Sequence, residues 1–406
     1  MIKTKPSNTR LRRLAIISQG LHNTSPFGKG ESGTLNTIKH LGYVQLDSIS
    51  VIQRAHHHVL SSRIPNYTPE FCDNLLAHRC IFEYWAHAAA FLPIDAFRYS
   101  LPYKHAIKSG QKHWYKNPDR KLMQELLARI KIDGPLRARD ISKDINTGDT
   151  KQTGWWDWKP AKKALEQLYM EGDLMVSSRD GFQKSYDLTE RVLPDSINTN
   201  MPTDEEMASY LLNQQLNAYG FTTLKGITYL RRNPALRKAA KTLVLDKLNT
   251  GELIEINVGN DDSFFVNADA FEQSANRISH RMRFLSPFDN LVIQRERLKN
   301  AFNYHFQLEC YLPEDKRKYG YFSLPILYKD AFIGRMDCKA HRKIKLLEIK
   351  ALHVENLDFD LQEMLDAFVK AIRPFIDFQA CNSLILNQVY PHTLEQAFQD
   401  AIKVIT

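Results

Sequence analysis

Two stretches of the chain share one pattern of apolar and polar positions. In residues 164–176 and 244–256, leucines three positions apart run into a glycine, then an acidic residue, then an apolar run. Such spacing is typical of one helix face, and glycine is typical of a helix end. Hairpin-type turn residues follow at 179–181 and 259–262. The pattern predicts, twice, a helix that leads into a β-hairpin, as in the second half of a winged helix.

Helical patterns precede both hairpins, as a winged-helix module requires. The first set predicts helices over 122–130, 134–142 and 158–169, and the second over 205–220, 222–230 and 237–251. We therefore expect a second winged helix in residues 111–197 and a third in residues 198–275.

The N-terminal part fits the same template less closely, because its loop at 22–33 is rich in glycine. The template places helices over 9–21 and 34–42 and the first wing strand over 43–49. We expect residues 1–110 to form an N-terminal winged helix that contains this strand.

The pattern changes after about residue 284. Short runs rich in Val, Ile, Tyr and Phe, such as 305–312 (HFQLECYL) and 319–328 (YGYFSLPILY), predict β-strands. An apolar stripe over 357–373 predicts one covering helix that stops at Pro374. Residues 276–406 should form a β-rich, barrel-like domain. The fold class is then α+β, with three tandem winged-helix modules before this C-terminal domain.

Composition and charge narrow the class of protein. The chain has 406 residues, 43% of them hydrophobic and 25% charged, which excludes disordered and collagen-like chains. The net charge is +9, and residues 1–60 hold eight Lys/Arg against two acidic residues. Residues 101–163 hold fifteen against seven. Such clusters favour a polyanion, and nucleic acid is the first candidate.

Other sequence features bear on compartment and cofactors. No apolar run approaches the length of a membrane span, so we expect a cytoplasmic, nucleoid-associated protein without a membrane partner. The five cysteines form no CxxC pair, so neither disulfides nor a structural zinc are expected. We also expect a monomer.

Residues 41–49 (LGYVQLDSI) place an amide and a carboxylate two positions apart in an apolar run. In an extended segment side chains alternate between faces, so Gln45 and Asp47 would project together while Val44 and Leu46 face the opposite layer. The arrangement indicates either the polar face of a strand or a site.

Five separated blocks of sequence carry a family resemblance. They are residues 42–49, 52–67, 82–93, 285–298 and 316–340. Together they resemble the winged-helix DNA glycosylases of the AlkZ/YcaQ family. In that family a Gln-apolar-Gln or Gln-apolar-Asp tripeptide is catalytic, and here Gln45-Leu46-Asp47 is in that place. The final aspartate resembles the YcaQ-like branch.

The resemblance implies a DNA repair enzyme that removes N7-alkylated purines from double-stranded DNA and unhooks interstrand crosslinks. Breaking an N-glycosidic bond passes through an oxocarbenium-like sugar, so Asp47 would stabilise the positive charge and accept a proton from water. The Gln45 amide would position that water. A cationic alkylated base leaves readily, so a second acid is not required.

The same segment bears on the nucleophile. Residues 40–50 contain no lysine, which favours water over a Schiff-base lysine and therefore monofunctional hydrolysis that leaves an abasic site. No cofactor is expected.

Several further residues are candidates for active-site support or for DNA contacts, and each could instead have a purely structural role. Glu83 and His87 would share a face if 82–93 were helical, with Trp85 available to stack on a base. Basic residues near the motif and in a later loop are candidate phosphate contacts, or else a solvated surface: Arg54, Arg63, Lys316, Arg317 and Lys318. The consecutive residues His56, His57 and His58 cannot converge on one tetrahedral metal, so no metal site is assigned.

Two classes of function therefore stay open at the level of the sequence. One is the monofunctional DNA glycosylase, and the alternative is a non-enzymatic winged-helix transcriptional regulator that reads DNA sequence.

Overall fold

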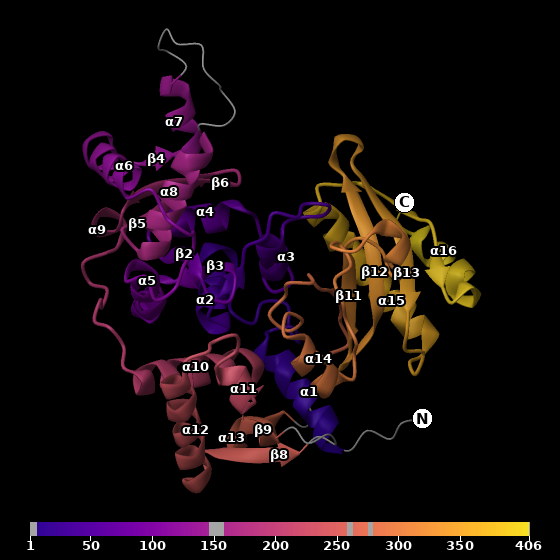
Figure 1. Ribbon diagram of the computed structural model, residues 1–406. Helices are drawn as coiled ribbons and strands as arrows, with labels where there is room; N and C mark the ends of the chain where they lie inside the picture. The colour runs from indigo at the N-terminus through magenta and orange to yellow at the C-terminus, as the bar shows by residue number, and fades with distance from the viewer. Residues whose placement is uncertain (1–5, 146–157, 258–262, 275–278, 406) are drawn as a thin grey trace. The chain divides into compact units, whose positions relative to one another are not determined.

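The computed structural model describes residues 6–145, 158–257, 263–274 and 279–405 (Figure 1). The chain forms two compact units. Unit 1 consists of residues 1–68 and 208–406, and unit 2 consists of residues 69–207. Unit 2 is therefore an insertion in the sequence of unit 1.

Unit 2 begins with a helix and a β-hairpin and ends with a winged-helix arrangement. Its first elements are α4 (Glu70–Ala77), β2 (Ile81–Trp85), β3 (Ala89–Pro93), η1 (Ile94–Ser100) and α5 (Leu101–Lys108). They are followed by α6 (Arg120–Asp133), β4 (Leu136–Arg137), α7 (Ala138–Ile145), α8 (Trp158–Glu171), β5 (Leu174–Asp180), β6 (Gln183–Leu188) and α9 (Thr189–Val192). The sheet order is β4-β6-β5. The predicted helix and hairpin around 164–188 are confirmed.

Unit 1 contains a second set of elements in the same order. They are α10 (Asp204–Tyr219), whose first residues belong to unit 2, then β7 (Phe221–Thr222), α11 (Leu224–Ile227), α12 (Pro234–Asn249), β8 (Leu253–Asn257) and β9 (Ser263–Asn267). The sheet order, β7-β9-β8, matches that of unit 2. The predicted hairpin turn at 259–262 lies outside the described residues. The helix before it and the two strands are as expected. Helix α13 (Ala268–Gln273) follows.

The N-terminal elements differ from the prediction at one point. Helices α1 (Pro6–Ser18) and α2 (Gly30–Leu41) overlap the expected helices, but β1 (Val44–Gln45) has two residues and leads to α3 (Ala55–Ser61). The placement of 43–49 as a wing strand is therefore wrong. In chain order, α2–β1–α3–α4–β2–β3 repeats the helix–strand–helix–helix–strand–strand order of the other two sets, so β1 corresponds to a module's first strand.

The C-terminal region of unit 1 is a mixed six-stranded sheet. The strands are β10 (Met282–Phe284), β11 (Ser323–Tyr328), β12 (Ala331–His341), β13 (Leu346–Val354), β14 (Ser383–Leu386) and β15 (Val389–Tyr390), in the order β10-β11-β12-β13-β14, with β15 also parallel to β13. The helices are α14 (Arg295–Phe302), α15 (Leu361–Phe378) and α16 (Glu395–Ile402), with short 3-10 turns at Glu314–Lys316, Arg342–Ile344 and His392–Leu394.

Two details of this region correct the sequence prediction. Residues 305–312 form no strand. Helix α15 does not stop at Pro374 but continues to Phe378. Proline removes one backbone donor, and the apolar side chains of Phe375 and Ile376, which are buried in the same core as the sheet, favour continuation of the helix.

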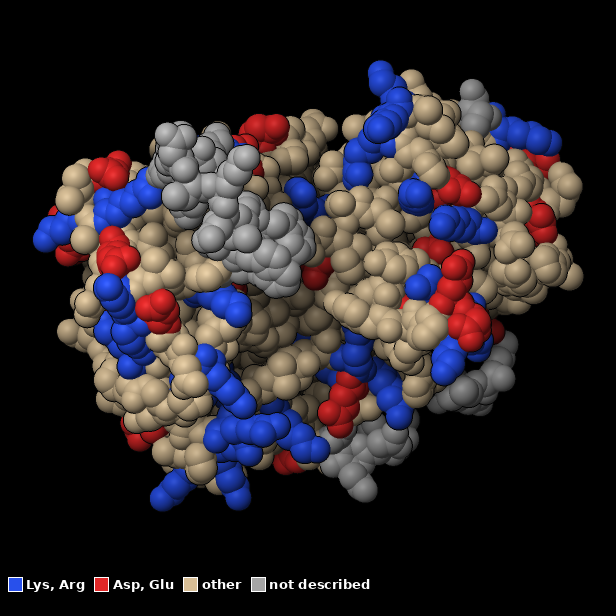
Figure 2. Space-filling view, turned by 45° about the horizontal axis from the view of Figure 1, so that its top comes forward, with Lys and Arg blue, Asp and Glu red and all other residues tan. Residues whose placement is uncertain are grey.

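The distribution of charged side chains on the surface is consistent with the net charge of +9. On the face drawn in Figure 2, Lys and Arg side chains lie in several groups with acidic side chains between them. Within the described parts of the chain, no helix is both long and apolar enough to cross a membrane. The five cysteines all lie within the described residues and form no disulfide.

Unit 2 buries a lysine among aromatic rings. The side chain of Lys104 is 4% exposed, and its Nζ lies 3.7 Å from the ring centroid of Phe97 and 4.6 Å from that of Tyr84. Among the described residues, none hydrogen-bonds to this Nζ. Burial lowers the pKa of Lys104 to about 7. Because burial disfavours the charged form, Lys104 destabilises the folded state at any pH at which its side chain is protonated.

We expect Lys104→Met to stabilise unit 2 most at low pH. The folded-state pKa of about 7 lies below the ordinary 10.5, so the cost is full below pH 7 and disappears above pH 10.5. Denaturant unfolding at several pH values should show the stability gap between variant and wild type closing by up to about 1.4 kcal/mol per pH unit in that window. The exposed control Lys121→Met should show no such trend, and a gap that is constant with pH would contradict the assignment.

Candidate active site

The segment that holds Gln45 and Asp47 begins at a tightly packed helix end. Gly42 ends α2 with φ 77°, and its N–H donates to the carbonyl of Ile38. A Cβ at this position would collide with the side chain of Gln214. Glycine is required here both by the left-handed backbone and by the close approach, so the start of β1 is fixed in direction.

Gln45 and Asp47 differ in exposure. Gln45 is the last residue of β1 and is 7% exposed, whereas Asp47 follows the strand and is half-buried. The Oδ1 atom of Asp47 accepts a hydrogen bond of 2.8 Å from the N–H of Ile49. The two side chains thus come from adjoining strand and loop, with the carboxylate held in a turn by its own backbone.

Burial raises the pKa of the Asp47 carboxyl above its ordinary value, and the hydrogen bond from Ile49 offsets part of that rise. A carboxylate that is partly removed from water is less well solvated. It is therefore a better base and interacts more strongly with a nearby positive charge.

A loop distant in sequence lies beside this carboxylate. Burial raises the pKa of the Cys310 thiol, and the charge of Asp47 adds to the rise. Burial also raises the pKa of Tyr311, and the charges of Cys310 and Asp47 add to the rise, although the residue is 78% exposed. An exposed aromatic ring next to a half-buried carboxylate can stack on a sugar or base. Sequence reasoning missed both residues because it placed them in a predicted strand.

The backbone after the motif is anchored to the C-terminal region. The carbonyl of Val51 accepts from the N–H of Ala340 at 2.8 Å, and the N–H of Gln53 donates to Oε1 of Gln379 at 2.7 Å. Ile52 is buried in the same apolar core as the sheet and α15. These contacts fix residues 49–53 although no regular element contains them.

The backbone before the motif is held by residues 289–297. The amide Nδ2 of Asn290 donates to the carbonyl of Tyr43 at 3.0 Å, and Asn290 itself is fully buried. The carbonyl of Asn290 accepts from Arg297, whose guanidinium lies 3.3 Å from the ring centroid of Tyr219. The hydroxyls of Tyr43 and Tyr219 are 3.4 Å apart. The chain at Tyr43, two residues before Gln45, is thereby positioned from both sides.

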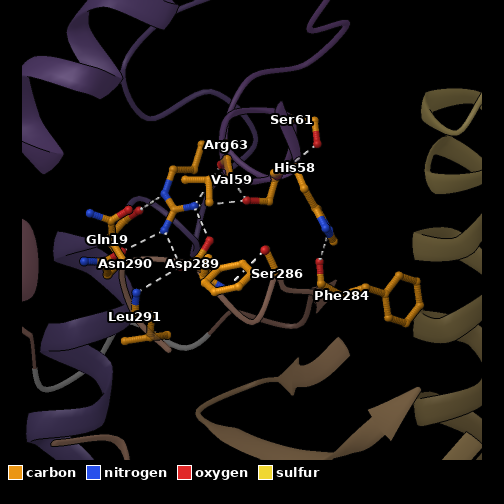
Figure 3. A network of polar contacts seen from close by, with 12 residues as sticks. Gln19, His58, Val59, Ser61, Arg63, Phe284, Ser286, Asp289, Asn290 and Leu291 are labelled. Atoms are coloured by element: carbon orange, nitrogen blue, oxygen red, sulfur yellow. Dashed lines mark hydrogen bonds and ion pairs between the residues drawn. The ribbon is translucent and has the colours of Figure 1, made fainter. Parts of the chain in front are cut away.

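Arg63 is the centre of a buried polar network (Figure 3). Its guanidinium pairs with both carboxylate oxygens of Asp289, at 2.7 and 3.0 Å, and both side chains are 0% exposed. It also donates to the backbone and side-chain oxygens of Gln19, each at 2.7 Å. The predicted phosphate contact at Arg63 is therefore wrong, because its guanidinium is enclosed and its donors are used inside unit 1.

The three consecutive histidines lie in α3, and two of them, His56 and His58, are buried. Nε2 of His58 donates to the carbonyl of Phe284 at 2.8 Å, and burial lowers the pKa of His58 to about 4. His56 is also buried, and His57 lies 2.8 Å from the hydroxyl of Tyr67. Among the residues described, no group of His, Cys, Asp or Glu side chains is arranged to hold a metal ion.

The other predicted phosphate contacts lie near the surface of unit 1. Arg54 directly precedes α3. Burial lowers the pKa of Arg342, and the nearby charge of Arg54 lowers it further. Lys316 and Lys318 are exposed in the loop that also carries Cys310, whereas Arg317 is half-buried and donates to the carbonyl of Leu312. Phosphate binding at Arg54, Lys316, Arg317 and Lys318 stays a prediction.

Glu83, Trp85 and His87 belong to unit 2, and the first two lie on strand β2. The helical spacing assumed for Glu83 and His87 is therefore wrong. The buried Glu83 carboxylate pairs with Arg179 at 2.7 Å and Lys184 at 2.6 Å. Burial would raise the pKa of Glu83, but these two charges outweigh it and hold the pKa below its ordinary value.

The ring of Trp85 is 4.9 Å from that of Trp114, in an edge-to-face arrangement. With Glu83 committed to its two cations, these contacts stabilise unit 2, and a role in support of the reaction stays a prediction for Trp85 and His87.

Two comparisons bear on what this arrangement is. Residues 38–371, more than half of the chain, match the model of a protein family described as DNA glycosylase AlkZ-like. Among solved structures, the chain is similar to the DNA glycosylase AlkZ of Streptomyces sahachiroi, with a TM-score of 0.60 and 16% sequence identity. That similarity covers 94% of this chain and 99% of the other. At such low identity the likeness shows the fold.

We expect Asp289→Ala to destabilise unit 1 by about 3–5 kcal/mol, because it leaves the buried Arg63 guanidinium without a counter-charge. Urea unfolding measures this loss. The double variant Arg63→Met/Asp289→Leu removes both charges and should lose less than Asp289→Ala alone. A double variant that is less stable than the single one would show that the buried pair itself supplies the stability.

Proposed function

Because the chain belongs to the AlkZ-like DNA glycosylase family, we propose that Asp47 and Gln45 carry out monofunctional hydrolysis of the N-glycosidic bond of N7-alkylated purines in double-stranded DNA. The observation that carries the proposal is the pair itself. A buried amide and a half-buried carboxylate lie two residues apart, on a segment anchored at both ends.

In this mechanism Asp47 has two roles and Gln45 has one. As the base leaves, positive charge develops on the sugar, and the Asp47 carboxylate stabilises it at short range. The same carboxylate takes a proton from the attacking water, which the Gln45 amide holds with its donor and acceptor atoms. The bond from sugar to base breaks, water adds at the anomeric carbon, and the alkylated base leaves as a neutral molecule.

The choice of substrate follows from the charge of the leaving group. N7-alkylation makes the purine cationic, so it departs without protonation by an enzyme acid. The motif carries one carboxylate, which suits such a lesion, and its Gln-apolar-Asp form resembles that of the YcaQ-like branch. We propose on this basis that the enzyme also unhooks interstrand crosslinks through N7 of guanine. Tyr311, exposed beside Asp47, would stack on the sugar or the damaged base.

We expect Asp47→Asn to reduce release of N7-methylguanine from a duplex by at least ~100-fold, which corresponds to ~2.7 kcal/mol in the barrier. Alkali-dependent strand breaks measure the abasic product, and a nitrogen-mustard crosslink tests unhooking in parallel. The exposed Asp366→Asn on α15 is the matched control. No release by the wild-type protein, together with sequence-selective DNA binding, would instead favour the winged-helix regulator.

We also expect the pH profile of kcat/KM to have an acid limb set by Asp47. The carboxylate form is the active one, so activity should fall as the pH drops through its pKa. Because burial raises that pKa, the midpoint should lie above the ordinary value of 3.8. Single-turnover rates corrected for spontaneous depurination measure the limb. Residual activity of Asp47→Asn should not show it, and an identical limb in that variant would assign it to another group.

A further inference from the structure

The two faces of the C-terminal sheet are unlike each other. One face is apolar and shares a core with α15, through residues such as Met336, Leu352 and Phe368. On the opposite face, three polar or aromatic side chains are direct neighbours across the strands. Arg335 of β12 is paired in register with His353 of β13, and His353 is paired with Tyr390 of β15.

This row of side chains is rigid. The rings of His353 and Tyr390 are stacked, with centroids 4.7 Å apart and an angle of 11° between their planes. Tyr319 meets the edge of His353 at 5.0 Å, and the Arg335 guanidinium lies 3.9 Å from the centre of the Tyr319 ring. Arg335 is fixed in turn by its ion pair with Glu355. The row therefore forms a preorganised wall.

The next row along the sheet is hollow. Asp337 of β12 is paired in register with Ala351 of β13, and the small side chain of Ala351 leaves a hollow of about 350 Å³. That volume is within the range of ligand pockets, roughly 300–1,000 Å³. Gly320, with φ 107°, closes over Asp337, and a Cβ there would collide with the carboxylate. Two small residues, Gly320 and Ala351, are thus part of the lining of the hollow.

The polar side chains that line the hollow include one carboxylate, Asp337, one amide, Gln388, and one cation, Lys318. The Asp337 carboxylate accepts from the N–H groups of Phe322 and Tyr321, at 3.2 and 3.3 Å, and each oxygen has a second acceptor position. Asp337 is 6% exposed. Lys318 is exposed at the rim. Burial raises the pKa of Asp337, and Lys350 is near enough for its charge to offset part of that rise.

We propose that this hollow binds the base of an unpaired guanine nucleotide in a DNA strand. Guanine carries two adjacent donors on its Watson–Crick edge, which match the two oxygens of a carboxylate such as Asp337, and base pairing hides that edge. The rings of Tyr319, His353 and Tyr390 line the hollow beside the base, and Lys318 and Lys350 face the phosphates.

One loop connects the hollow to the proposed active site. Residues 303–322 carry Cys310 and Tyr311 beside Asp47 and also Lys318–Gly320 beside the hollow. A strand opened at a lesion could thus extend from one to the other. That DNA is the source of the nucleotide rests on the proposed function.

The test compares short fluorescein-labelled thymine strands that carry one central guanine, inosine or adenine. Inosine differs from guanine only in lacking the N2 amine. We expect fluorescence anisotropy to show binding to the guanine strand about fivefold or more tighter than to the inosine strand. Ala351→Leu, which fills the hollow without removing a polar group, and Asp337→Asn should both abolish the difference.

Controls separate this proposal from others. Lys370→Ala on α15 should keep the preference for guanine, whereas Lys318→Ala should weaken all strands equally. Equal binding of guanine and inosine by the wild type overturns the proposal, and stronger competition by free dGMP than by the strand overturns the assignment to a strand. Asp47→Asn should keep the guanine preference while losing base release, so failure of the glycosylase proposal would be seen independently.

Discussion

Unit 1 depends on the pairing of Arg63 with Asp289. A guanidinium and a carboxylate that are both removed from water must stay together, because either charge alone would be left buried without compensation. The pair joins the segment after α3 to residues 285–298, and Gln19 brings the end of α1 into the same network. Asn290 follows Asp289 and donates a hydrogen bond to the carbonyl of Tyr43. The ion pair therefore helps to position the strand that carries Gln45.

The chemistry of the site follows from how unevenly its two polar side chains are buried. Gln45 is enclosed and can be buried because an amide is neutral. Asp47 keeps partial contact with water, which limits the free-energy cost of a carboxylate there. The carboxylate is still buried enough to interact strongly with a nearby positive charge. The residues whose pKa values respond to the charge of Asp47, Cys310 and Tyr311, come from the loop 303–322. The backbone that positions the carboxylate and the surface that would meet DNA are therefore supplied by different parts of the chain.

The sequence predicts local patterns well and long-range pairings poorly. The helix and hairpin patterns at 164–188 and 244–267 could be read because their periodicity lies within one element. Gln45 and Asp47 stood out because their motif is contiguous. Arg63 was assigned to the surface because a single arginine gives no sign of a buried partner 226 residues away. Glu83 was misplaced on a helix for a related reason, since its two cations come from β5 and β6 and the strand pairing that buries it is not local.

The insertion of unit 2 has a consequence for the order in which the protein can form during synthesis. Chains are made from the N-terminus, and compact parts fold as they become complete. Residues 69–207 are all available well before Asp289 has been added, so unit 2 can fold while Arg63 still lacks its carboxylate. Val51 and Gln53 must wait for their partners, which are Ala340 in the C-terminal sheet and Gln379 directly after α15. The segment bearing Gln45 and Asp47, made among the first, would therefore be among the last to reach its final structure on the ribosome.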